Sequence, residues 1–267
     1  MKVNSDFFFK SFIISLIIFA LIAAIIIVNL YVNNVAIEPQ KRASNILIGI
    51  THNGDLLSMT LVHCDPKDNS VTLLQIPDNT IISDGTVLQN LYQSHKPLEL
   101  IKFIQDMTGA KVNRYIFFST DTLSSLIDST GNFQYLVRYP FVHSGNEYSG
   151  NIYMTGEIAK AMFTYPKYDM TKVSLSAIGE SFLHNVLSSY SNLNDMQKFD
   201  NEIKSIFTRY RVNTNLSDSE ITGYCEFFSR FSSLEQLSVA IDGEYLATSS
   251  NLYFVPTNNK VSKNIFK

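Results

Sequence analysis

The histidines and cysteines are the side chains of this 267-residue sequence best suited to metal binding or nucleophilic catalysis. The five histidines are His52, His63, His95, His143 and His184, and none has a second His, Cys or carboxylate at the spacing of a metal-binding helix. The sequence contains no G-x-S-x-G elbow, no G-x-x-x-x-G-K-[ST] loop and no G-x-G-x-x-G turn. Generic motifs therefore predict neither a catalytic residue nor a metal site.

The two cysteines, Cys64 and Cys225, are far apart in the sequence. His63 precedes Cys64 in an expected strand, where neighbouring side chains point to opposite faces, so these two cannot form a Cys–His pair. Cys64 and Cys225 could form a disulfide in an oxidising compartment, but we expect two buried free thiols. Whether the two side chains meet is left open by the sequence.

Composition excludes some partners. Basic and acidic residues nearly balance, 21 against 24, and no basic face is evident, which argues against a nucleic-acid partner. Aromatic positions such as Phe117, Phe118, Tyr224 and Phe228 are interpreted as core residues rather than as a platform for a ligand.

An N-terminal apolar segment predicts a membrane anchor. No charged residue occurs between Ser11 and Ile37, and this run is longer than the apolar part of a signal peptide. We expect a cytoplasmic tail at 1–10, a transmembrane helix at 11–33, a stalk at 34–43 and an extracytoplasmic domain at 44–267. The protein is thus expected in the cell membrane, as a single-pass protein with its N-terminus in the cytoplasm.

Strand and helix patterns alternate through the body of the chain. They predict one α/β domain with a central mixed sheet flanked by helices. The expected strands are 45–50, 59–63, 71–76, 114–118, 133–137, 238–241 and 252–255. The expected helices are 97–107, 120–131, 155–163, 173–187, 195–210 and one that follows a capping box at Ser217–Glu220. A polar loop is expected at 144–151.

Several of these segments, in order, resemble the LytR–CpsA–Psr (LCP) family. Asn45–Ile50 (NILIGI), Met59–Lys67 (MTLVHCDPK) and Val71–Pro77 (VTLLQIP) are similar to the opening strands of the LCP domain. Further similar segments are Arg114–Ser119 (RYIFFS), Leu126–Gly131 (LIDSTG), Met154–Ala159 (MTGEIA), Phe182–Leu183 and Thr214–Ser217 (TNLS). The resemblance covers the body from about residue 44 to 255, and no single motif carries it.

The resemblance implies an LCP-like domain in a membrane-anchored, extracytoplasmic protein of bacterial cell-envelope assembly. Members of that family transfer a glycopolymer from a polyprenyl-pyrophosphate carrier to peptidoglycan. A magnesium ion and several arginines hold the pyrophosphate, and the apolar tail lies between the sheet and the helices. Fixed guanidiniums and a divalent cation suit a transition state whose negative charge is spread over several oxygens.

The positions that carry these charges in the family are substituted here. They align with Asp55, Leu57, Asp78, Asn79, Thr164, Pro166, Leu175 and Ile178. Asp78 stands where the family has an arginine, and it would repel a pyrophosphate. We therefore expect no catalytic residue, no metal ligand and no cofactor. A replacement cationic set is conceivable from Arg138, Lys160, Lys167 and Lys172, although ordinary surface cations are the simpler interpretation.

Three hypotheses follow for function. The first is a non-catalytic binding or scaffolding member that retains the lipid-tail pocket or partners an active LCP relative. The second is a divergent phosphotransferase with a relocated site. The third is a surface module for protein interaction that uses the fold without any lipid. A core without a pocket would favour the third.

Overall fold

The computed structural model describes most of the chain after residue 37, namely residues 38–82, 85–93, 97–169, 174–193, 196–248 and 252–257. The expected cytoplasmic tail and transmembrane helix lie outside this range. Within it, no helix combines the length and the apolar character needed to cross a membrane. The description that follows concerns the unit from Glu38 onward.

A six-stranded mixed sheet forms the centre of this unit. Its strands, in spatial order, are β7 (Asn213–Thr214), β4 (Arg114–Ser119), β1 (Ser44–His52), β2 (Asp55–Asp65), β3 (Ser70–Ile76) and β8 (Glu235–Ala240). β2 is antiparallel to β1 and β3, whereas β4 and β8 run parallel to their neighbours β1 and β3. Asn53 and Gly54 join β1 to β2 with positive φ angles of 50° and 93°, as a tight hairpin turn requires.

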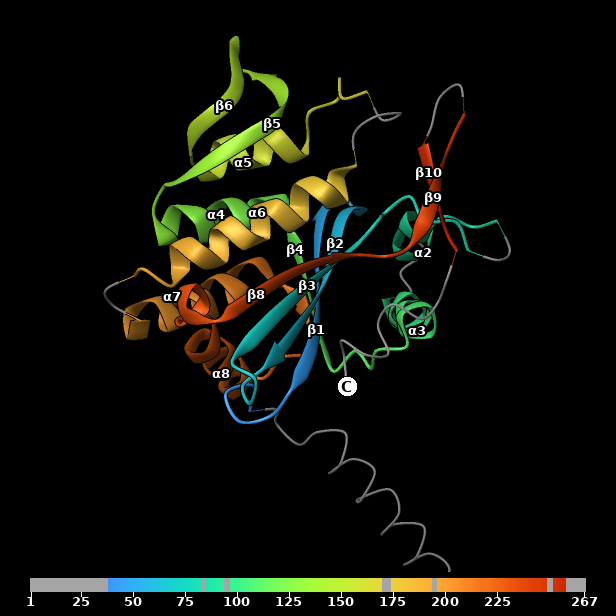
Figure 1. Ribbon diagram of the computed structural model, residues 1–267. Coiled ribbons are helices and arrows are strands. Elements are labelled where there is room, and N and C mark those ends of the chain that lie inside the picture. Colours follow the sequence, from blue (N-terminus) through green and yellow to red (C-terminus); the bar gives the residue numbers. More distant parts are fainter. Residues whose placement is uncertain are drawn as a thin grey trace, which may run out of the picture. The chain divides into compact units, whose positions relative to one another are not determined.

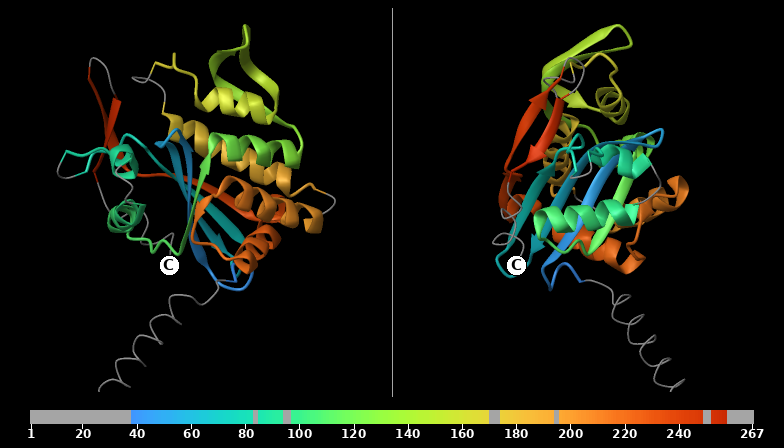
Figure 2. Two further views of the ribbon diagram at one scale, coloured as in Figure 1. Left: turned by 180° about the vertical axis from the view of Figure 1, so that it is seen from behind. Right: turned by 90° about the vertical axis from the view of Figure 1, so that its right-hand side faces the viewer.

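Helices cover both faces of the sheet, as expected (Figures 1 and 2). One face carries α4 (Thr120–Thr130), α6 (Leu175–Tyr190), α7 (Met196–Tyr210) and α8 (Asp218–Phe228), and the other carries α2 (Leu88–Gln93) and α3 (Pro97–Thr108). Successive side chains of a strand point to opposite faces of the sheet and therefore pack in different apolar clusters. Ile46 packs in the cluster with α7 and α8, whereas Leu47 packs in the cluster with α2 and α3.

Two hairpins lie outside the six-stranded sheet. β5 (Phe133–His143) pairs with β6 (Asn146–Met154), and β9 (Gly243–Ala247) pairs with β10 (Leu252–Pro256). The helix α5 (Gly156–Phe163) follows β6 and contacts α4, and a short 3-10 turn, Phe231–Ser233, precedes β8. The expected loop at 144–151 is wrong, because the chain turns within Ser144 and Gly145, both at positive φ, and returns as β6.

Both cysteines are free and buried, which confirms the expectation of two unpaired thiols. They belong to the same apolar cluster, on β2 and α8. Burial raises the pKa of both thiols, that of Cys225 to about 11, so both are inert as nucleophiles near neutral pH.

Candidate functional site

An apolar cavity of about 150 Å³ lies between the sheet and the helices α4, α6, α7 and α8. Side chains of β1, β2 and β4 form one wall, and side chains of the four helices form the others. The residues that line it include Ile46, Ile48, Ile50, Phe118, Leu123, Ile127, Leu183, Val186, Ile203, Phe207, Tyr224 and Phe228. The core of this domain is therefore not completely filled.

The residues that line the cavity are mostly apolar, and few of their polar atoms lack a hydrogen-bond partner. The Tyr190 hydroxyl donates to the Cys225 carbonyl oxygen at 3.1 Å, and the Tyr224 hydroxyl donates to Ser44 Oγ at 3.1 Å. These phenols are satisfied by the protein itself and need no partner from a ligand. The cavity suits an apolar chain, because such a ligand loses no hydrogen bonds on entering it.

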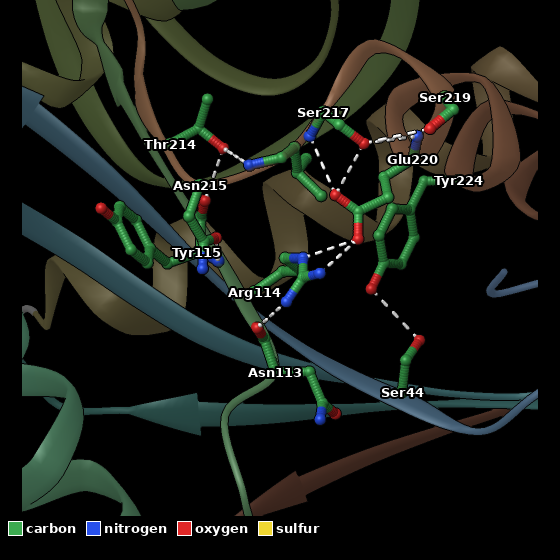
Figure 3. A network of polar contacts seen from close by, with 11 residues as sticks. Ser44, Asn113, Arg114, Tyr115, Thr214, Asn215, Ser217, Ser219, Glu220 and Tyr224 are labelled. Carbon is green, nitrogen blue, oxygen red and sulfur yellow. Dashed lines mark hydrogen bonds and ion pairs between the residues drawn. The ribbon is translucent and has the colours of Figure 1, made fainter. Parts of the chain in front are cut away.

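A buried ion pair fixes α8, which forms one wall of the cavity, against β4. Glu220 Oε1 accepts from Arg114 Nε at 2.7 Å and from Arg114 Nη2 at 2.5 Å, and the two side chains are only 2% and 12% exposed. Figure 3 shows Ser217 at the other carboxylate oxygen, to which its backbone N–H and its hydroxyl both donate at 2.9 Å. The capping box expected at Ser217 thus starts α8 and also binds Arg114.

Asp78, one of the positions expected to be substituted relative to the family, has the most distinctive environment among them. Its side chain is buried, and Ser176 Oγ donates to its carboxylate at 3.0 Å, close to the start of α6. Burial raises the pKa of Asp78 to about 6, although hydrogen bonds from Ser176 act in the opposite direction. Hydrogen bonds in both directions with Ser176 hold Asp78 beside the first turn of α6, because the Asp78 N–H also donates to Ser176 Oγ at 3.0 Å.

The remaining substituted positions are structural or exposed. Leu57, Leu175 and Ile178 pack in one apolar cluster with the hairpin β5–β6. Asp55 accepts from Gln93 Nε2 at 2.7 Å, and Asn79 Nδ2 donates to the Leu252 carbonyl oxygen at 2.6 Å. Two more close the end of α5, where Thr164 is the C-cap and the exposed Pro166 follows. Three of these positions are therefore close together, but they belong to an apolar cluster and not to a charged site.

Three of the four conceivable replacement cations lie in the described part of the chain. Lys160 Nζ pairs with Asp121 at 2.5 Å on an exposed surface, and Lys167 is exposed. Arg138 lines a second, smaller cavity. Lys172 lies outside the described residues.

The described residues do not fit a magnesium site. No three acidic, histidine or cysteine side chains in this part of the chain come together as a metal-binding group. The Asp78 carboxylate is already engaged by Ser176, and Asp55 by Gln93. Magnesium needs several oxygen ligands in near-octahedral geometry, which these side chains do not offer.

The family resemblance implies an apolar pocket between the sheet and the helices, but residue types alone did not indicate which residues line it. Phe117, Tyr224 and Phe228 are buried core residues, as interpreted, and Tyr224 and Phe228, together with Phe118, also line the cavity. Residue type gives no signal of this difference, since apolar side chains line the cavity and fill the core alike.

No protein-family model matches the sequence, and no curated protein matches it. Solved structures share its fold. Bacillus subtilis TagV is similar with a TM-score of 0.64 and 18% identity, over 81% of this chain and 91% of that chain. TagT bound to LIIa-WTA is similar with a TM-score of 0.63 and 15% identity, over 83% and 88%.

A protein from Enterococcus faecalis described as a transcriptional regulator is similar with a TM-score of 0.63 and 14% identity, over 83% of this chain and 84% of that chain. TagV and TagT are LCP proteins. The chain therefore has an LCP-like fold, which confirms the resemblance drawn from its sequence segments.

Proposed function

We propose that this chain, with its LCP-like fold, is a membrane-anchored extracytoplasmic protein of bacterial cell-envelope glycopolymer assembly. In this proposal it binds the apolar chain of a polyprenyl-phosphate lipid and does not carry out the family's transfer reaction. The apolar cavity between the sheet and α4, α6, α7 and α8 is the observation that carries the proposal. The TagT structure, whose ligand is a wall teichoic acid species, supports the ligand class.

The energetics of the cavity favour an occupant. Each methylene that moves from water into apolar surroundings contributes about 0.8 kcal/mol. A hydrocarbon chain in the cavity would thus gain its transfer free energy and restore the contacts that the lining side chains lack.

The substituted charges support the non-catalytic part of the proposal. At two of the positions that align with family arginines, Leu175 and Ile178 contribute to an apolar cluster. At a third, the carboxyl of Asp78 is buried against Ser176. Loss of one contact to a developing oxyanion typically costs about 2.7–4 kcal/mol of transition-state stabilisation, and several are replaced here.

Lipid retention tests the binding part. The full-length protein is purified in mild detergent, and co-purifying lipid is identified and quantified by mass spectrometry. We expect about one polyprenyl phosphate or pyrophosphate per chain. Ile203→Trp fills the cavity from α7 and should reduce retention at least about fivefold. Ser205→Trp, an exposed position of the same helix, is the matched control and should retain lipid.

Two results would contradict the proposal. Lipid binding is excluded if the wild type is empty while an active LCP protein, purified in the same way, retains lipid. The non-catalytic part fails if the chain shows magnesium-dependent transfer that is lost in Lys160→Gln or Lys172→Gln, because that result would identify a relocated active site.

A further inference from the structure

The helix α7 covers part of the apolar cavity but is itself only lightly buried. Its side chains Phe199, Ile203 and Phe207 line the cavity. Among the described side chains of α7 only Phe199 and Ile206 are buried, whereas α4, α6 and α8 contain five, seven and seven buried residues. An element with few buried contacts opens locally at a lower free energy than global unfolding requires. Of the four helices around the cavity, α7 is therefore the one expected to move.

Polar side chains join α7 to α4. The Ser129 hydroxyl donates to Glu202 Oε1 at 2.9 Å, and the Ser125 carbonyl oxygen of its own helix also lies at 2.9 Å. A serine hydroxyl has one proton, so the two acceptors share it. When α7 moves away, Ser129 keeps the acceptor within α4, and water can solvate the half-buried Glu202 carboxylate. Separation of the two helices thus leaves neither group unpaired.

The contact between α7 and α8 has the same property. Lys204 Nζ donates to Thr222 Oγ1 at 2.6 Å and to Asp200 Oδ2 at 2.7 Å. The ion pair of Lys204 with Asp200 lies within α7 and stays intact when this helix moves. Thr222 Oγ1 also lies 3.2 Å from the Asp218 carbonyl oxygen of its own helix, to which it can donate. Both of these interhelical ties therefore have a replacement within a single helix.

The C-terminal end of α7 is fixed. The helix ends at Tyr210, and Arg211 follows with a φ angle of 49°, in the left-handed region that few residues other than glycine adopt. The chain then forms β7, where Thr214 Oγ1 donates to the Tyr115 carbonyl oxygen at 2.7 Å. At the same end of α7, Ser125 Oγ donates to the Tyr210 hydroxyl at 2.7 Å. A rotation about this end would carry the N-terminal end of the helix away from the cavity.

We propose that α7 is a lid on the apolar cavity, with the hydrogen bond between Ser129 and Glu202 as its latch. The lid rotates about Arg211, withdraws Phe199 and Ile203 from the cavity and admits an apolar chain. Exposure of these two apolar side chains opposes opening, so the closed form predominates. The ligand is that of the proposed function, on which this inference rests, whereas the motion is a property of the chain alone.

Hydrogen exchange, measured by mass spectrometry on the full-length protein in mild detergent, tests the motion. An isolated helix of this length is only marginally stable in water, so the amides of α7 exchange when it leaves its neighbours. We expect residues 199–207 to exchange at least about tenfold faster than the middle of α8. Ser129→Ala should raise the rate in α7 about fivefold without changing α8, and Glu202→Gln, which keeps an acceptor without the charge, should raise it less. Asp121→Asn breaks an exposed ion pair between α4 and α5, and this control should leave α7 unchanged.

Two covalent tethers between α4 and α7 test the role of the lid in ligand passage. A short bis-maleimide joins Ser129→Cys to Glu202→Cys at the latch or, in the matched control, Ser125→Cys to Tyr210→Cys at the fixed end. The native cysteines are buried and stay unmodified in the folded protein. Release of co-purified lipid into fresh detergent is followed by mass spectrometry. The latch tether should slow release at least about tenfold, whereas the tether at the fixed end should leave it nearly unchanged.

Three outcomes would overturn the lid. They are exchange in α7 as slow as in α8, an equal effect of Ser129→Ala and Asp121→Asn on α7, and lipid release that is equally fast with either tether. Hydrogen exchange needs no ligand. A wild type without lipid would therefore contradict the proposed function while the exchange rates still decide whether α7 opens.

Discussion

Removal of Arg114 should leave the Glu220 carboxylate buried without its cationic partner. In Arg114→Met the apolar stem of the side chain is approximately kept while both N–H donors to Glu220 Oε1 are lost. Breaking one partner of a buried ion pair typically costs 3–5 kcal/mol. Because Ser217 still donates twice to the other carboxylate oxygen, we expect a cost near the lower limit, about 3 kcal/mol in the free energy of unfolding.

The double variant Arg114→Met/Glu220→Leu distinguishes a buried charge from lost packing. It removes both charges, so the desolvation cost disappears together with the attraction, and half of the capping box is lost as well. We expect it to be about 1 kcal/mol less stable than the wild type, and hence more stable than the single variant. Lys41→Met, which breaks an exposed pair with Glu38, is the control and should leave the free energy of unfolding nearly unchanged.

Urea unfolding of the full-length protein in detergent, followed by far-ultraviolet circular dichroism, measures these differences. The reasoning is refuted if Arg114→Met costs less than about 1 kcal/mol, or if the double variant is less stable than the single one. The slope of the free energy of unfolding against urea concentration must be the same in all variants, because an equal slope shows that the same amount of surface is exposed on unfolding.

Three further predictions concern buried positions. Between about pH 4 and pH 6 folded Asp78 holds a proton that the unfolded chain has released, since its folded pKa is raised to about 6. The free energy of unfolding of the wild type should therefore fall, by on the order of 3 kcal/mol relative to that of Asp78→Asn, as the pH rises through this interval. Unfolding of both proteins at pH 4, 5, 6 and 7 measures this difference. Gly179→Ala should lower the midpoint of thermal unfolding, because the added methyl group would overlap the Ser58 hydroxyl. Adding Ser58→Gly to this variant should restore the midpoint. A midpoint in Gly179→Ala equal to that of the wild type would contradict the close packing. Cys64 and Cys225 should not react with an aromatic disulfide reagent until the protein is unfolded, and rapid labelling of the native protein would show that they are accessible.

The central strands and most helices could be predicted from the sequence because burial imposes a pattern on them. β1, β2 and β3 are nearly continuous buried runs, and α8 begins with a capping box whose hydrogen bonds are present in the structure. β6 could not be predicted in this way. Most of its side chains are exposed, so its sequence is polar like a loop, and its strand conformation comes from backbone pairing with β5.

The candidate sites depend on contacts between distant segments, which sequence patterns do not reveal. Ser129 and Glu202 meet between α4 and α7, although 73 residues separate them in the sequence. The large cavity arises because the helices do not fill the space above β1, although Ile48 and Phe118 are of the same type as neighbouring core residues. The resemblance predicts that Asp78 replaces a charge of the family, but the sequence did not reveal that Asp78 would be enclosed beside Ser176 at the start of α6.

The parallel pairing of β3 with β8 has a consequence for the order of folding. Ser70 lies opposite Glu235, so this edge of the sheet cannot close until almost the whole chain is available. The β1–β2–β3 meander needs only local turns and can form first, whereas contacts between distant residues carry a large loop-closure entropy and form slowly. Until β8 arrives, β3 has an unpaired edge, and the nascent protein is most exposed to misassociation in that interval.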